Sequence, residues 1–192
     1  RCGRGDRGVK GSTERFLIFG AGLCGSLLAL RLGQRGFKVR VLEMRPDLRT
    51  VDISAGRSIN LAFSNRGLKA INLVGLESKV KRLCIPMHGR MIHDKEGKTF
   101  LSNYSGRENE SINSISRELL TALLLDEAEA LDNVTIEFEN RCTKVDFDAK
   151  IGVFENRKTG TTFEVSADLI FGTDGAGSAL RKSYFQERKF LF

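Results

Sequence analysis

The sequence predicts a mixed α/β fold, with a parallel sheet that is interrupted by antiparallel strands. Three observations predict it. An apolar run at residues 16–19 leads through a glycine-rich turn into a segment with helical spacing, and a second strand follows at residues 38–43. Short strands with polar turns fill the middle of the chain. The apolar run at residues 167–172 then has the character of a buried strand that resumes the parallel sheet.

Composition excludes several classes of protein. The chain has 192 residues, 41% of them hydrophobic, and a net charge of +7, but its basic residues are interspersed with acidic ones and not gathered with aromatics, so we expect no nucleic-acid partner. The longest apolar run, residues 16–30, contains glycines and is too short to cross a bilayer, so the visible chain needs no membrane contact. The four cysteines have neither metal-ligand nor secreted-disulfide spacing, so we expect no metal site and a reducing, intracellular compartment.

The two ends of the chain look unlike the rest. Residues 1–14 are rich in glycine and arginine without a hydrophobic period, which predicts an unstructured or non-native leader. The apolar run at residues 190–192 has nothing after it to pack against, which predicts truncation. We therefore expect one domain over residues 15–192 that stops before its natural end.

The turn after the first strand carries the pattern G-x-G-x-x-G at Gly20, Gly22 and Gly25. In a strand-turn-helix context the first glycine permits the tight turn, the second lets a pyrophosphate approach the backbone, and the third allows close packing of the helix on the strand. The phosphates then face the helix N-terminus, whose N–H groups and dipole favour anions. This predicts a dinucleotide site, against the alternative of a turn that serves packing alone.

Glu43 ends the second strand where a ribose-binding acid belongs. A carboxylate there repels the 2'-phosphate of NADP, so the site is expected to take FAD or NAD. The interruption of the β-α repeats after Glu43 favours FAD. Arg45 is open to two interpretations, since it could stack on the adenine or pair with a phosphate, or could simply be solvated.

Hydrophobic spacing predicts the remaining elements. Ser64 and Ser116 are placed to cap helices, the second with an apolar stripe of leucines, and a hairpin is expected from the strands 90–94 and 99–103. Further extended segments are expected at residues 112–116, 135–138, 143–147, 153–155 and 162–165, the last four in the manner of a β-meander, and a final helix at residues 178–184.

Several segments together resemble the flavoprotein aromatic hydroxylases and, within them, the branch that hydroxylates kynurenine. The resemblance covers essentially the whole chain from Phe16 onward and implies a Rossmann-like FAD-binding sheet with an inserted β-meander and partial antiparallel substrate-domain strands. The segments that carry it are residues 20–28, 55–62, 64–67, 85–93, 114–117 and 168–176.

The resemblance also implies which residues meet the cofactor and the substrate. The adenosine half of FAD is expected against Cys24, Leu42, Glu43, Met44, Arg45, Ala62, Arg117 and Cys142, several of them through backbone atoms. Asp174 and Gly175 match the Asp-Gly motif that supports the pyrophosphates; the alternative is an ordinary strand-to-helix turn with Asp174 as a local hydrogen-bonding residue. Arg90 and Tyr104 match the pair that holds the substrate carboxylate, for which a guanidinium and a phenol are suitable donors. Cys24 and Cys142 are otherwise expected to be small packed residues.

The chemistry that the resemblance implies resides in the cofactor. NADPH reduces FAD, O2 adds to give a C4a-hydroperoxide, and an oxygen atom passes to the ring of L-kynurenine. Members of the family are cytoplasmic in bacteria and attached to the mitochondrial outer membrane in eukaryotes. Two alternatives stay open, a related hydroxylase with another aromatic acid as substrate and an inactive nucleotide-binding fragment.

Overall fold

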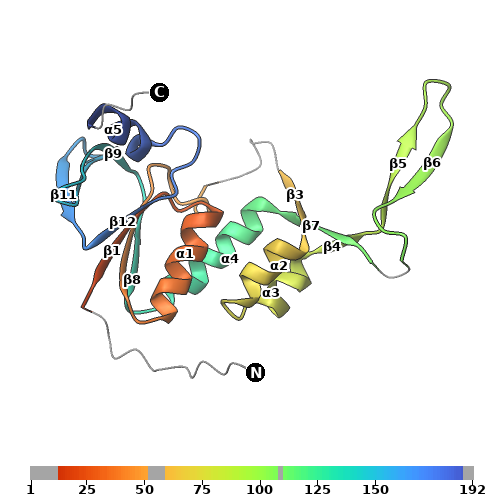
Figure 1. Ribbon diagram of the computed structural model, residues 1–192, viewed down its shortest axis with the longest axis horizontal. Helices are drawn as coiled ribbons and strands as arrows, with labels where there is room; N and C mark the ends of the chain where they lie inside the picture. Colours follow the sequence, from red (N-terminus) through yellow and green to blue (C-terminus); the bar gives the residue numbers. More distant parts are fainter. Residues whose placement is uncertain (1–12, 52–58, 108–109, 188–192) are drawn as a thin grey trace. The chain divides into compact units, whose positions relative to one another are not determined.

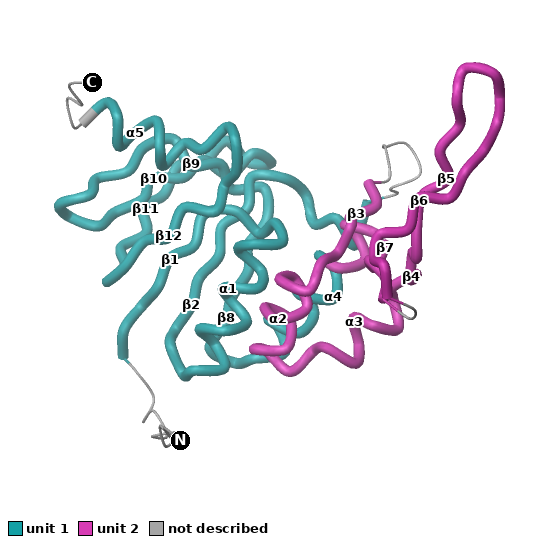
Figure 2. Tube along the Cα trace, turned by 45° about the vertical axis from the view of Figure 1, so that its right-hand side comes forward, with its two compact units in different colours: residues 1–53, 121–192 teal, residues 54–120 magenta. Residues whose placement is uncertain are grey.

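The computed structural model describes residues 13–51, 59–107 and 110–187 (Figure 1). Two compact units make up the chain: one of residues 1–53 with 121–192, and a second of residues 54–120 (Figure 2). Of the predicted leader, only residues 13 and 14 are among the described residues. The segment 55–58 and the terminal run 190–192 lie outside them. The domain boundary at residue 14 therefore stays a prediction.

A four-stranded parallel sheet with the order β12-β1-β2-β8 forms the centre of the first unit. Its strands are β1 (Arg15–Phe19), β2 (Lys38–Leu42), β8 (Val134–Glu137) and β12 (Leu169–Gly172). Phe19, the last residue of β1, lies opposite Leu42 on one side and Gly172 on the other. The three neighbouring strands therefore end at the same level, and the predicted parallel sheet is confirmed.

Two helices precede strands of this sheet. Helix α1 (Leu23–Gln34) connects β1 to β2, and helix α4 (Arg117–Glu129) precedes β8. Helix α1 begins within the glycine-rich turn, whose Gly22 is the N-cap. In α4 the expected apolar stripe is buried at Leu120, Leu124 and Ala128. Leu119 departs from it at 54% exposed, and Leu125 is fully buried in addition.

The predicted β-meander packs on the parallel sheet. It consists of β9 (Asn140–Asp146), β10 (Ile151–Asn156) and β11 (Thr162–Ser166) in the order β11-β10-β9. The segment 135–138 had been assigned to the meander, but it is β8 of the parallel sheet, where Val134 and Ile136 are buried. Helix α5 (Ala179–Glu187) follows β12. The core between sheet and meander contains Leu17, Phe19, Leu42, Val145, Phe154, Val165 and Ala167.

The second unit is antiparallel. Its three-stranded sheet has the order β3-β7-β4, from β3 (Asn60–Phe63), β7 (Ile112–Ser116) and β4 (Ile85–Met87). The strands β5 (Gly89–His93) and β6 (Thr99–Asn103) form the expected hairpin, and helices α2 (Asn65–Asn72) and α3 (Glu77–Leu83) complete the unit. Ser64 is the N-cap of α2 as predicted, but its side chain makes no capping bond. The sequence does not predict β3, β4 and α3. Pro86 argues against a strand at β4, and α3 buries Val80 alone, so neither segment shows a hydrophobic period.

Candidate functional site

Most of the predicted cofactor residues follow the ends of three neighbouring parallel strands. The glycine turn follows β1, Glu43 follows β2, and the turn with Asp174 follows β12. Since β12, β1 and β2 are adjacent and end level, the structure brings these three segments to one edge of the first unit. In open α/β sheets, ligands bind at the carboxyl ends of the strands.

The three glycines of the turn differ in their surroundings. Gly20 has φ of +93°, which favours glycine, and a Cβ at Gly25 would stand 1.9 Å from the carbonyl oxygen of Gly20. A Cβ at Gly22 would meet no atom of the described residues within 4 Å. The first and third glycines therefore have the turn and close-packing geometry that the sequence predicted, and the second leaves open space at the backbone for a ligand.

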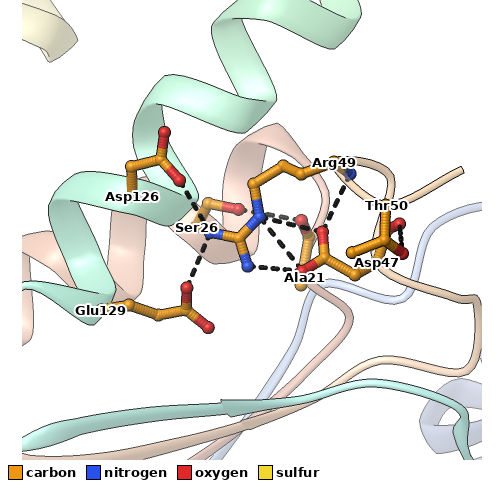
Figure 3. A network of polar contacts seen from close by, with 7 residues as sticks. All are labelled: Ala21, Ser26, Asp47, Arg49, Thr50, Asp126 and Glu129. Carbon is orange, nitrogen blue, oxygen red and sulfur yellow. Dashed lines mark hydrogen bonds and ion pairs between the residues drawn. The ribbon is translucent and has the colours of Figure 1, made fainter.

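The N-terminus of α1 is suited to an anion. Among the residues that the structure describes, no side chain caps it, and its first turn holds no acidic residue, so its N–H groups are suited to receive a pyrophosphate. Ser26, which is fully buried, donates from Oγ to the carbonyl oxygen of Ala21 at 2.8 Å and so holds the turn (Figure 3). Cys24 lies in this first turn of α1; the expectation that it is packed is wrong, because its side chain points outward and is exposed.

Glu43 connects the glycine turn to the end of β2. Its Oε2 accepts the N–H of Ala21 at 2.8 Å, and its Oε1 accepts the N–H of Arg45 at 2.9 Å. A carboxylate has about four acceptor positions, so each oxygen can still accept a ribose hydroxyl. The carboxylate is thus held in place and remains chemically able to bind a sugar. The residues present at this edge fit the adenosine diphosphate portion of FAD.

The residues on either side of Glu43 differ in exposure. Leu42 is 2% exposed and its side chain packs in the core, so a cofactor can reach only its backbone, whose carbonyl oxygen accepts the N–H of Gly20 at 2.9 Å. Met44 is 46% exposed, and Arg45 is exposed as well. Both interpretations of Arg45 stay open.

The turn after β12 has local functions in the structure. Asp174 accepts the N–H groups of Ala179 and Leu180 on Oδ2, at 2.7 and 3.3 Å, and so caps α5. Sequence reasoning missed Thr173, whose Oγ1 donates to the carbonyl oxygens of Phe19 and Gly20, both at 2.8 Å. No local pattern marks this contact, since the two ends of it are more than 150 residues apart in the chain. A cofactor role for Asp174 and Gly175 stays a prediction.

Cys142 lies on β9 near this turn. Its burial, together with the negative charge of Asp174, raises the pKa of its thiol to about 12. The Cys142 side chain is therefore a neutral, largely packed group, which agrees with its expected structural role. Its cofactor contact stays a prediction.

Four predicted residues belong to the second unit. Ala62 lies on β3, and the N–H of Arg117, at the start of α4, donates to the carbonyl oxygen of Ile59 at 3.0 Å. Arg90 lies opposite Ser102 in the hairpin, and the N–H of Tyr104 donates to the carbonyl oxygen of His88 at 2.9 Å. With this register Arg90 and Tyr104 share one face of the hairpin as diagonal neighbours. Their roles, and those of Ala62 and Arg117, stay predictions.

A cavity of about 830 Å³ lies elsewhere in the first unit. Its walls come from the beginnings of β1, β2 and β8 and from the end of β11, at the amino ends of the parallel strands. It is therefore at the opposite edge of the sheet from the glycine turn, and it is not the cofactor site.

Comparison with known proteins identifies the family. Residues 14–189 match the FAD-binding domain family. The chain belongs to this family. FAD is accordingly the cofactor of this domain. The assignment of the glycine turn and Glu43 to its adenosine diphosphate portion stays a prediction.

Among the curated relatives of this FAD-binding domain are three kynurenine 3-monooxygenases. The protein of Myxococcus xanthus is 43% identical over 170 residues, which are 88% of this chain and 37% of the relative. That of Anopheles gambiae is 41% identical over 91% of this chain and 36% of the relative, and that of Caenorhabditis elegans is 39% identical over 91% of this chain and 41% of the relative. The chain thus spans about two fifths of the length of these relatives, which come from both bacteria and animals.

Solved structures show the same fold. The oxygenase of 2-methyl-3-hydroxypyridine-5-carboxylic acid is 26% identical, with a TM-score of 0.69 over 91% of this chain and 43% of that protein. The flavin-dependent monooxygenase PieE, solved with FAD and substrate, has a TM-score of 0.75 at 18% identity over 89% of this chain and 32% of that protein. The predicted fold class is therefore confirmed. Within the described parts of the chain, no helix is both long enough and apolar enough to cross a membrane.

Proposed function

We propose that this chain is the cofactor-binding part of an FAD- and NADPH-dependent enzyme that hydroxylates L-kynurenine to 3-hydroxykynurenine with O2. The observation that carries the proposal is the hydrogen bond between Glu43 and Ala21, which joins a ribose-binding acid to a glycine turn at the edge of a parallel sheet. The names of the relatives supply the reaction.

The residues of the first unit bind and orient the cofactor. The N–H groups at the start of α1 receive the pyrophosphate, Gly22 leaves room for it, and Glu43 accepts the ribose hydroxyls. FAD, once bound, supplies the redox chemistry with NADPH and O2. No side chain of this unit is required as a nucleophile.

The hairpin of the second unit supplies the proposed substrate contacts. Arg90 and Tyr104 are both exposed on one face of β5 and β6, so their guanidinium and phenol are available to a carboxylate. A planar carboxylate accepts two parallel bonds from a guanidinium, which fixes the direction of the substrate as well as its position.

The cofactor site is tested by Glu43→Ala. We expect the FAD Kd, measured from quenching of flavin fluorescence, to rise at least tenfold, because the variant loses the ribose acceptor and the bond to Ala21. Asp132→Ala, at the opposite edge of the sheet, is the control. An unchanged FAD Kd in Glu43→Ala would refute the proposed site.

The reaction is tested with the complete gene product reconstituted with FAD. L-kynurenine should stimulate NADPH oxidation and yield 3-hydroxykynurenine, and Arg90→Lys should raise the KM for kynurenine more than tenfold without changing the FAD Kd. Lys95→Gln, in the turn of the same hairpin, is the matched control. If another aromatic acid stimulates NADPH oxidation more than kynurenine does, the protein is a different hydroxylase. If the protein does not bind FAD, the alternative of an inactive fragment is supported.

A further inference from the structure

The loop after β2 is anchored by an arginine that the proposed function does not use. Arg49 donates from Nε and Nη2 to the carboxylate of Asp47, at 2.9 and 2.6 Å, within the same loop. From Nη1 it donates to Asp126 at 2.8 Å and to Glu129 at 2.7 Å, both on α4 (Figure 3). One guanidinium therefore ties the loop to a helix that is about 80 residues further along the chain.

This cluster is organised around Arg49. The side chains of Arg49 and Asp47 are only 22% and 18% exposed, and the guanidinium lies 5.7 Å from the ring centre of Phe138. Hydrogen bonds to carboxylates raise the pKa of Arg49 further above its ordinary value, and the bond to Asp47 has the largest effect. The guanidinium therefore stays charged. Three carboxylates share one cation, and their mutual repulsion would drive the loop from α4 if that cation were lost.

The anchored loop also carries the contacts of Glu43. The Oε1 of Glu43 accepts the N–H of Arg45, so the position of the Glu43 carboxylate depends on the path of the backbone through residues 43–49. The near end of the loop is held by the backbone, because the carbonyl oxygens of Glu43 and Arg45 accept the N–H groups of Asn140 and Glu139 at 2.8 and 3.1 Å. The far end is held by the bonds of Asp47 and Arg49.

We propose that Arg49 is a positioning residue for the adenosine end of the cofactor site. It fixes the far end of the loop against α4 and thereby keeps the N–H of Arg45 and the carboxylate of Glu43 in place for the ribose. This inference rests on the proposed site at the glycine turn and Glu43.

The test is Arg49→Lys. Lysine keeps the charge, but a single ammonium group cannot reproduce the paired bonds to Asp47 while it also reaches Asp126 and Glu129. We expect the FAD Kd to rise about tenfold, and the Kd of ADP to rise by the same factor, because ADP contains the part of FAD that this loop meets. Amide hydrogen exchange in residues 44–50 should become faster, as expected for a released loop.

Arg40→Lys is the matched control. Arg40 also forms a paired bond, to Glu137 at 2.5 and 2.9 Å, and also lies 5.7 Å from the ring centre of a phenylalanine, Phe163, but it does not contact the loop. We expect Arg40→Lys to lower the Tm while its FAD Kd stays within twofold of that of the parent. If Arg49→Lys fails to fold, Asp126→Asn combined with Glu129→Gln releases the guanidinium from α4 and should still raise the FAD Kd.

The possible failures are distinguishable. A parent protein that binds neither FAD nor ADP overturns the proposed site, and this inference with it. A parent that binds both, with Arg49→Lys unchanged, overturns the positioning role alone. The positioning role is also overturned if both Arg40→Lys and Arg49→Lys raise the FAD Kd in proportion to the decrease in Tm, because general destabilisation would then explain the weaker binding.

Discussion

At the scale of single residues, two glycines of one turn have opposite requirements. Gly25 has no room for a side chain, since a Cβ there would stand 1.9 Å from a backbone oxygen of Gly20 and 2.6 Å from Oγ1 of Thr173. Gly22 has an ordinary negative φ of −70° and open space around its Cα. The first of these glycines supports the fold, and the second keeps space free for the ligand.

The two alanine variants should therefore separate stability from binding. We expect Gly25→Ala to lower the free energy of unfolding by about 3 kcal/mol, because a backbone clash must be relieved. Gly22→Ala should change it by less than about 0.5 kcal/mol but raise the FAD Kd at least tenfold. Urea unfolding and flavin fluorescence measure the two effects, and a stable Gly25→Ala would contradict the close packing.

The cysteines provide a second test at this scale. Cys24 is exposed at the start of α1, whereas burial raises the pKa of Cys142 to about 12, so the Cys142 thiol stays protonated at pH 8. A thiol reagent should label Cys24 and leave Cys142 unlabelled, as mapped by mass spectrometry. FAD should slow the labelling of Cys24 because the pyrophosphate covers that helix turn, while Cys84 serves as the internal reference. Rapid labelling of Cys142 would contradict its packing.

At the scale of elements, the strand-to-helix turn after β12 is stabilised by its aspartate. Asp174 accepts two N–H groups of α5, so Asp174→Ala should lower the free energy of unfolding by about 1 kcal/mol. Asp174→Asn keeps an acceptor oxygen and should lose less than half of that. Urea titration of the three proteins measures the difference. Equal losses in the two variants would show that the charge and not the cap is what stabilises the helix.

The anchored loop should respond to acid. Hydrogen bonds from Arg49 hold the pKa of Asp47 below its ordinary value, so this carboxylate stabilises the fold above the unfolded pKa of about 3.9 and loses that effect as the pH falls through its lower folded value. The parent should therefore be more stable than Asp47→Asn at pH 6, and the difference should shrink below about pH 4. Thermal unfolding from pH 6 to pH 3 measures it. A difference independent of pH would contradict the ion pair.

At the scale of the whole molecule, the cofactor should stabilise the chain. A ligand that binds only the folded state at 100 times its Kd adds about 2.7 kcal/mol, which for a chain of this size corresponds to a rise in Tm of roughly 5–10 °C. We expect this shift with FAD and a smaller one with riboflavin, which lacks the adenosine diphosphate portion. Differential scanning fluorimetry measures it. Equal shifts with the two flavins would place the main contacts outside the glycine turn.

Local signals in the sequence predicted the elements on which the site is built. A strand, a glycine turn, a helix and a second strand are encoded within about 30 residues, so Gly20, Gly22, Gly25 and Glu43 could be identified from spacing. The hairpin at residues 90–103 could likewise be predicted, because its strands and turn are adjacent in the chain. The substrate role of Arg90 and Tyr104 came from the resemblance alone. The elements β4 and α3 were missed because Pro86 disfavours a strand and because α3 buries Val80 alone, so neither carries an apolar run or period like those of β1 and β12.

The sequence by itself determined the type of fold, the dinucleotide turn and the acid that accompanies it, because each depends on backbone preferences and periodicity over a short span. Only the tertiary structure decided that β12 lies beside β1, that β8 joins the parallel sheet, and that Arg49 reaches α4. These contacts join residues that are about 80 to 150 positions apart, and their partners are selected by strand pairing and by the burial of a shared core. A local sequence pattern does not predict which distant segments pair, because the pairing depends on the free energy of the assembled unit.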